Sequence, residues 1–182
     1  MQLKERYEKE IAPSIIKDFK LENSMQAPKI TKIVVNAGIG PFRENKEAVA
    51  SFEKELTDIV GQKVSTKKAR LSVAGFKVRK GDTVGFSATL RGARMWAFLE
   101  KFISVALPRV RDFRGLSSTA FDKAGNYSIG IKEHVIFPEV NPNTVRGIRS
   151  MQLTLVTDTE SIELSRALLE RLGVPFEREE EK

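Results

Sequence analysis

Seven basic residues lie within the stretch from Gln62 to Gly81, which contains no aspartate or glutamate. Outside this stretch the lysines and arginines equal the acidic residues in number, so the net charge of +7 is concentrated here. Such a local positive potential attracts a polyanion, which releases condensed counterions as it binds. A solvated basic loop would explain a bare count of lysines, whereas this concentration favours nucleic acid as the partner. The seven residues are Lys63, Lys67, Lys68, Arg70, Lys77, Arg79 and Lys80.

Catalytic and metal-binding patterns are sparse. The chain has no cysteine, which excludes disulfides, thiolate metal sites and cysteine nucleophiles. His134 is the only histidine, and no serine or carboxylate pairs with it at a motif spacing, so we interpret it as a structural or surface residue. Gly38 and Gly40 begin like a dinucleotide fingerprint, but Arg43 replaces the third glycine, and a turn is favoured. The sequence predicts a protein that is not an enzyme and has no metal or cofactor; a small phosphate-handling enzyme is the alternative.

The sequence also indicates the cellular compartment in which the protein works. The chain begins with charged residues where a signal peptide would need an apolar core, and no apolar run reaches the length of a membrane span. We therefore expect a cytoplasmic protein with no membrane contact. Anionic lipid is an alternative partner for a basic chain, but lipid binding favours a basic amphipathic helix, and this stretch has turn and strand character.

Apolar spacing predicts the elements that position these residues. Apolar residues recur every four positions from Leu3 to Phe19, which predicts an N-terminal helix that Pro13 kinks or divides. A β-branched run predicts a strand over Ile30 to Asn36. Asn45 is placed to cap a second helix, and Gly61 is placed to end it. The apolar stripe of this helix is Val49, Phe52, Leu56 and Ile59.

The basic stretch divides into extended and turn segments. Lys63 to Ala69 is predicted to be a strand, and Leu71 to Gly81 a projecting loop with Ala74-Gly75-Phe76 at its tip. Thr83 to Arg91 alternates apolar and polar residues, so a strand there has one apolar and one polar face.

The same alternation predicts two further strands, over residues 127–132 and 151–155. Between the basic stretch and these strands, apolar residues from Met95 to Ala106 predict the main core helix. Asp158 or Thr159 is expected to open a last helix. The apolar residues of that helix are Ile162, Leu168 and Leu172.

The order of predicted elements contains the split strand-helix-strand arrangement of ferredoxin-like folds. We predict an α+β fold of this ferredoxin-like kind, with a mostly antiparallel sheet of about five strands and helices on one face. Length favours a single domain over residues 1–182, with a frayed tail at 177–182. The other sheet face is polar and lacks outward aromatics, which favours contact with a folded RNA surface over stacking on single-stranded bases.

A second basic cluster follows the predicted core helix, where a loop containing glycine and serine begins. Capping of the helix C-terminus explains part of it, because the helix dipole favours cations there. Three arginines in such a short segment exceed that requirement, and they predict a second RNA contact. They are Arg109, Arg111 and Arg114.

Seven segments carry a family resemblance. The longest are L-P-R-V-R-D-F-R-G-L at Leu107 to Leu116 and F-D-K-A-G-N-Y-S-I-G-I-K-E at Phe121 to Glu133. The others are K-I-V-V-N-A-G-I-G at Lys32 to Gly40, G-Q-K at Gly61 to Lys63, F-K-V-R-K-G at Phe76 to Gly81, R-M-W-A-F-L-E-K at Arg94 to Lys101, and I-F-P-E at Ile136 to Glu139. With them the chain resembles, over nearly its whole length, the L-five family of bacterial large-subunit ribosomal proteins, which carry 5S rRNA. It departs from the family pattern at Leu71 and Gly75.

The resemblance implies an α+β fold related to the RNA-recognition motif and a place in the central protuberance of the ribosome. Its partners there would be 5S rRNA, 23S rRNA and neighbouring large-subunit proteins. It maps the 5S rRNA site to Asn36, Gln62 and Thr89, supported by the cations Lys63 and Arg91. The charge pattern adds three further cations to this site, namely Lys67, Lys68 and Arg70.

Two other contacts follow from the resemblance. A loop would reach the P-site tRNA, through Val73, Ala74, Gly75, Phe76, Lys77, Val78, Arg79 and Lys80. A later segment would face a small-subunit protein across an intersubunit bridge, through Pro138, Glu139, Val145, Arg146 and Arg149. Outside the ribosome we expect a monomer.

Overall fold

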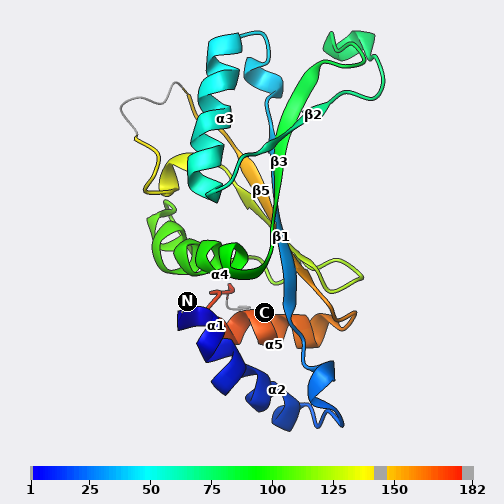
Figure 1. Ribbon diagram of the computed structural model, residues 1–182, viewed down its shortest axis with the longest axis vertical. Coiled ribbons are helices and arrows are strands. Elements are labelled where there is room, and N and C mark those ends of the chain that lie inside the picture. Colours follow the sequence, from blue (N-terminus) through cyan, green and yellow to red (C-terminus); the bar gives the residue numbers. More distant parts are fainter. Residues whose placement is uncertain (1, 142–146, 178–182) are drawn as a thin grey trace, which may run out of the picture. The chain divides into compact units, whose positions relative to one another are not determined.

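The computed structural model describes residues 2–141 and 147–177. In this part of the chain five strands form one antiparallel sheet with the spatial order β2-β3-β1-β5-β4 (Figure 1). The predicted α+β fold is confirmed. Every predicted strand is present, with ends that differ from the prediction by two residues at most. The strands are β1 (Ile30–Gly38), β2 (Ser65–Lys68), β3 (Thr83–Leu90), β4 (Tyr127–Ile131) and β5 (Met151–Thr157).

The described residues form five α-helices, which lie between the strands along the chain in the predicted order (Figure 1). A π-helical turn at Tyr7–Ile11 separates α1 from α2, and Pro13 lies in the first turn of α2. The N-terminal helix is therefore divided near the proline, as predicted. None of the described helices has both the length and the apolar character needed to cross a membrane. The helices are α1 (Gln2–Arg6), α2 (Ala12–Asp18), α3 (Lys46–Val60), α4 (Gly92–Lys101) and α5 (Ile162–Arg171).

Contacts between residues divide the chain into two compact units. Unit 1 comprises Met1–Ile33, Leu90–Ile129 and Thr154–Lys182, and unit 2 comprises Val34–Thr89 and Gly130–Leu153. Four of the strands, β1, β3, β4 and β5, contribute residues to both units. That the whole chain is a single domain stays a prediction about cooperative folding.

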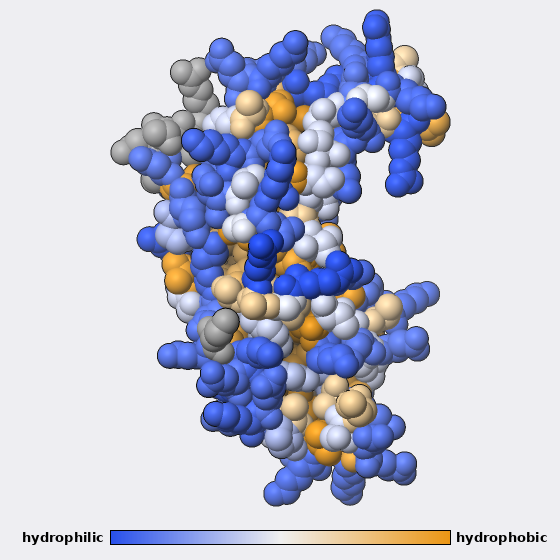
Figure 2. Space-filling model, viewed as in Figure 1, coloured by the Kyte–Doolittle hydropathy of each residue, from blue (hydrophilic) through white to orange (hydrophobic). Residues whose placement is uncertain are grey.

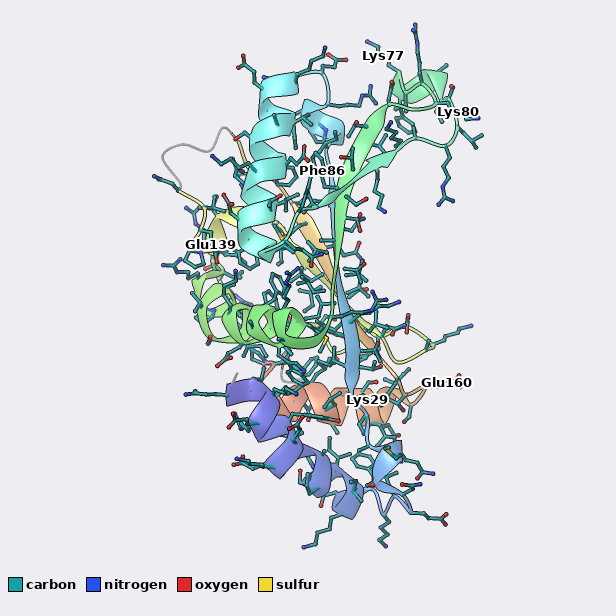
Figure 3. All side chains as sticks on the ribbon, in the orientation of Figure 1. Lys29, Lys77, Lys80, Phe86, Glu139 and Glu160 are labelled. Carbon is teal, nitrogen blue, oxygen red and sulfur yellow. The ribbon has the colours of Figure 1, made fainter. Side chains whose placement is uncertain are left out.

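Helix α3 of unit 2 begins and ends where its sequence predicts. The Asn45 side chain accepts a hydrogen bond from the Ala48 amide (3.1 Å), and Gly61 ends the helix with a left-handed φ of 71°. The buried Phe52 ring packs edge-on against Phe86 of β3, with ring centroids 6.2 Å apart. Figure 3 shows Phe86 between β3 and α3. The predicted cap and stop are confirmed, and the middle of the apolar stripe is in the core.

The strands of unit 2 have one buried and one polar face. Ala37 and Phe86 are buried, whereas Asn36 on β1 and Thr89 on β3 are exposed. β1 and β3 approach so closely that a Cβ built on Gly85 would lie 2.6 Å from the Ala37 carbonyl oxygen, so only glycine fits there. The predicted polar sheet face is therefore present in unit 2.

The start of α5 in unit 1 differs from the prediction. Ser161 caps the helix, because its hydroxyl accepts a hydrogen bond from the Leu164 amide (3.4 Å). Asp158 instead accepts a hydrogen bond from the Lys29 amide (2.8 Å), and Thr159 accepts one from the Ser161 amide (3.2 Å). The two predicted cap residues therefore order the chain before the helix and do not cap it.

Two residues of the predicted apolar stripes are exposed. Ile162 is 45% exposed and Phe19 is 38% exposed, whereas Ile15 and Leu168 within the same stripes are fully buried. Ile162 is the first residue of α5, and Phe19 follows the last residue of α2. The apolar periodicity therefore identified the buried face of each helix, but it extended that face by one residue that is in fact exposed.

Candidate nucleic-acid interface

The seven cations of the basic stretch lie in unit 2, on β2 and in the segments that flank it. All seven side chains are exposed, and none of them forms an ion pair with another described residue. By contrast, Lys4 and Lys29 of unit 1 are paired with carboxylates. Figure 3 shows Lys77 and Lys80 at the outer end of the loop between β2 and β3. The positive charge of this stretch therefore remains free for a polyanion.

Strand β2 is an edge strand, which offers another explanation for two of these lysines. Lys67 pairs with Gly85, and the register of the ladder shifts between Lys67 and Lys68. Lysines and bulges on an edge strand prevent pairing with a second chain. Lys63, Arg70 and the three cations of the loop lie outside β2, so protection of the edge does not account for them.

The structure brings together two of the three neutral residues of the predicted 5S rRNA site. Gln62 donates a hydrogen bond from Nε2 to the Thr89 carbonyl oxygen (3.2 Å) across 27 positions of sequence. The Gln62 Oε1 and the exposed Thr89 hydroxyl are not used by this bond. Asn36 is exposed on β1, and its side chain has no hydrogen-bond partner among the described residues. Such groups bind phosphates and 2′-hydroxyls on a folded RNA surface.

The supporting cations lie next to these residues in the sequence. Lys63 is exposed directly after Gln62 in unit 2. Arg91 is exposed directly after β3, where it precedes the first residue of α4, and it belongs to unit 1. Both side chains are therefore accessible to RNA.

The basic loop is held in place near its tip. Val73 and Val78 form an isolated bridge on either side of a short 3₁₀ turn. The Arg43 guanidinium donates hydrogen bonds to the carbonyl oxygens of Phe76 (3.3 Å) and Lys77 (2.9 Å). Lys77 has a left-handed φ of 51°, which is uncommon for a residue other than glycine. Sequence reasoning missed Arg43, because no local pattern relates it to a loop 33 positions away.

The loop from Leu71 to Gly81 exposes apolar as well as basic side chains. Leu71 and Phe76 are each 77% exposed, and Val73 is 43% exposed. Figure 2 shows hydrophobic atoms among hydrophilic ones at the outer end of this loop. An exposed aromatic ring beside cations is suited to stacking on an unpaired base. The loop therefore offers different chemistry from the hydroxyl and amide groups of the sheet face.

The second basic cluster lies in unit 1. Arg109, Arg111 and Arg114 are all exposed, and none forms an ion pair with a described residue. The loop that carries them is held at its end by two backbone hydrogen bonds, from the Leu116 amide to the Pro175 carbonyl oxygen (2.8 Å) and from the Glu177 amide to the Leu116 carbonyl oxygen (2.9 Å). The arginines therefore extend from an anchored segment.

The predicted bridge segment is only partly accessible. Pro138 and Glu139 are exposed, whereas Val145 and Arg146 lie outside the described residues. Arg149 was expected on the partner-facing surface, but its side chain is 3% exposed and donates from Nη1 to Glu55 Oε2 (2.8 Å). Its guanidinium also lies against two aromatic rings, with centroid distances of 5.1 and 5.2 Å. These rings belong to Phe42 and Phe52. The expected exposure of Arg149 is corrected, because this residue anchors the core.

His134 belongs to the same buried cluster. It is fully buried, and its Nε2 lies 3.0 Å from Glu55 Oε2. Burial lowers the pKa of His134 below its usual 6.5 and outweighs the attraction of Glu55, so the ring is neutral at pH 7. The enzyme alternative, with Gly38 and Gly40, therefore has no accessible base at His134. No group of three potential metal ligands occurs in residues 2–141 and 147–177.

Comparisons with known proteins give consistent results along the chain. A family model described as ribosomal protein L5 matches residues 23–79, and a second model, which describes the C-terminus of the same ribosomal protein family, matches residues 83–176. The chain is 48% identical over 176 residues to the large ribosomal subunit protein uL5 of Thermotoga maritima, covering 97% of this chain and 96% of that protein. It is 45% identical over 178 residues to uL5 of Prochlorococcus marinus, covering 98% and 99%. It is 46% identical over 176 residues to uL5 of a Synechococcus species, covering 97% and 98%.

Proposed function

Because the chain belongs to the ribosomal protein L5 family and is a non-enzymatic component of the large ribosomal subunit in the cytoplasm, we propose that it binds 5S rRNA and attaches it to 23S rRNA. The 5S site combines two kinds of group. Cations supply affinity through phosphate contacts, and neutral side chains supply the fit to one folded RNA. The cations are Lys63, Lys67, Lys68, Arg70 and Arg91, and the neutral residues are Asn36, Gln62 and Thr89.

One observation carries this proposal: the hydrogen bond from Gln62 to the Thr89 carbonyl beside the unpaired cations of the same unit. It holds Gln62 in a single orientation before RNA arrives, so less side-chain entropy is lost on binding. A merely solvated basic loop has no need for an oriented amide next to its charges. The arrangement supports recognition of a particular RNA surface.

We also propose a binding partner for each of three further surfaces. The loop from Val73 to Lys80 contacts the P-site tRNA, which suits its free cations and the exposed Phe76 ring. The arginine cluster of unit 1 contacts 23S rRNA. The segment containing Pro138 and Glu139 faces a small-subunit protein across the intersubunit bridge. Arg149 is not included in that contact, because it is buried.

A gel-shift titration with 5S rRNA tests the central proposal. An unrelated folded RNA of similar length serves as competitor, because nonspecific phosphate contacts bind both RNAs. We expect the labelled 5S rRNA complex to persist in excess competitor. If unlabelled 5S rRNA and the unrelated RNA displaced the labelled 5S rRNA equally well, the protein would bind RNA without specificity and the proposal would be wrong.

A further inference from the structure

A hollow on the polar sheet face of unit 2 lies beside Asn36. It has a volume of about 390 Å³, is open to solvent and crosses the adjacent strands β1, β5 and β4. Gly38 of β1 and Gly130 of β4 line it, and a Cβ built on either glycine would meet no atom within 4 Å. Neither glycine has a left-handed φ that would exclude other residues. The packing of the protein itself therefore does not require these two glycines.

Four polar side chains line the same hollow, and all of them are exposed. None is hydrogen-bonded to another described residue. Among the described residues, no carboxylate lines the hollow, and its one charge is the ammonium of Lys132. Two amides and a hydroxyl both donate and accept hydrogen bonds, as a ribose 2′-hydroxyl requires, and the ammonium suits a phosphate. The four residues are Asn36, Lys132, Ser150 and Gln152.

We propose that this glycine hollow, defined by Gly38, Gly130 and these four polar residues, receives a ribose-phosphate unit of the RNA backbone. The inference rests on the proposed function and extends it, because it adds β5 and β4 to an RNA-binding face so far assigned to β1 and β3. Asn36 belongs both to the predicted 5S rRNA site on β1 and β3 and to the glycine hollow. In this arrangement the sheet reads RNA by shape and by 2′-hydroxyl contacts, without base stacking.

Charge and shape favour RNA over a protein segment as the occupant. The described lining of the hollow carries one positive charge and no acid, and it belongs to the unit that carries the seven cations without a described ion-pair partner. A protein partner buried there would need a carboxylate for Lys132, whereas every nucleotide supplies a phosphate. Glycines also permit the close approach of a backbone, which the wide and shallow minor groove of an RNA helix presents.

A graded steric series at Gly130 tests the inference. Because a Cβ there meets no described atom within 4 Å, Gly130→Ala adds a methyl group to the hollow without an internal clash, and Gly130→Val adds two more carbon atoms. We expect 5S rRNA affinity to fall with side-chain size, by about tenfold or more for valine. Ala50→Val, on an exposed position of α3 in the same unit, is the matched control and keeps wild-type affinity. Thermal melting of each variant verifies that it is folded.

Substitution of Lys132 gives a second readout, independent of steric effects. Lys132→Ala is expected to reduce the slope of log affinity against log salt by about one, and Lys132→Arg to retain it. If wild-type protein binds 5S rRNA and both Gly130→Val and Lys132→Ala bind it equally well, the hollow is not an RNA site. If those variants keep RNA affinity but enter large subunits poorly, a protein occupies the hollow and the inference is wrong. Failure of wild-type protein to prefer 5S rRNA would instead refute the proposed function.

Discussion

Three uncharged side chains lie among the cations of the predicted interface: Asn36, Gln62 and Thr89. A cation on a flexible stem attracts any phosphate, whereas an oriented amide or hydroxyl bonds only where a partner lies at the right distance. Gln62 is the clearest case, since its Nε2 is already bonded to the Thr89 carbonyl. At the residue scale, we therefore expect these groups to determine which RNA is bound.

Alanine at all three positions is expected to weaken 5S rRNA binding without changing its salt dependence. Each RNA group left without its buried partner costs about 1–3 kcal/mol, and no phosphate contact is lost. Gel-shift affinities at several salt concentrations measure both quantities. Wild-type affinity in the Asn36→Ala, Gln62→Ala, Thr89→Ala triple variant would exclude these residues from the site.

The other residue-scale feature is the buried His134. Its neutral ring donates from Nε2 to Glu55 in the tautomer that fits the geometry, and its Nδ1 is buried without a hydrogen-bond partner in the part of the chain that the structure describes. The Nη1 of Arg149 shares the same Glu55 oxygen. Burial is the main reason that the pKa of His134 is lowered, and the positive charge of Arg149 adds to it, so this cluster favours neutral histidine.

His134→Gln is expected to make stability less sensitive to acid. The pKa of His134 in the folded protein is below 6.5, so the unfolded chain binds the proton first as the pH falls. Stability is therefore unaffected well above pH 6.5 and decreases below it, by up to about 1.4 kcal/mol per pH unit relative to the variant. Urea unfolding between about pH 5 and pH 8 measures this difference. Parallel stability profiles for the two proteins would mean that His134 does not titrate in this range.

At the element scale, the basic stretch consists of two parts with different surroundings. Lys63 to Arg70 surrounds the edge strand β2, close in sequence to Gln62. Leu71 to Gly81 forms the loop that Arg43 holds by two carbonyl oxygens. A strand edge continuous with the sheet and a loop with an exposed aromatic tip suit different RNA partners.

Alanine at the four cations around β2 is expected to lower the salt slope of 5S rRNA binding by about four, if each of them neutralises one phosphate. The replaced residues are Lys63, Lys67, Lys68 and Arg70. A control protein with Lys4→Ala and Lys9→Ala loses two cations that pair with carboxylates in unit 1, and its slope is expected to stay at the wild-type value. An unchanged salt slope in the quadruple variant would show that these four cations do not contact the phosphates of 5S rRNA.

Deletion of the loop tip at Gly75-Phe76-Lys77 is expected to leave 5S rRNA affinity within about twofold of wild type, a change below about 0.5 kcal/mol. The reason is that the tip is assigned to the P-site tRNA and is not part of the sheet. Gel shifts measure 5S rRNA binding. Crosslinking to tRNA in assembled ribosomes separately measures contact with the P-site tRNA. A large loss of 5S affinity would place the tip in the 5S rRNA site.

At the scale of the whole molecule, the two compact units share four strands of one sheet. Each shared strand continues from one unit into the other without interruption. Loss of either unit would expose the ends of these strands and their unpaired backbone groups, at a cost in free energy. We therefore expect the two units to fold and unfold in one cooperative transition. This is what the prediction of a single domain means.

A two-probe unfolding experiment tests this cooperativity. Trp96, the only tryptophan, reports on unit 1. Because the chain has no cysteine, a single Lys54→Cys substitution on the exposed side of α3 carries a fluorescent label in unit 2. We expect both signals to show the same denaturant midpoint. Separate midpoints would show that the chain consists of two domains.

The sequence by itself determined the strands, the cap and stop of α3, the polar sheet face and the concentration of positive charge. These features depend on residue type and on spacing over a few positions, as Asn45 and Gly61 illustrate. The resemblance in sequence also led to the family. Only the tertiary structure decided which distant side chains meet: Gln62 at the Thr89 carbonyl, Arg43 at the loop tip and Arg149 in the core. Periodicity shows that a side chain is buried or exposed, but its partner depends on how strands and helices pack across long separations in sequence.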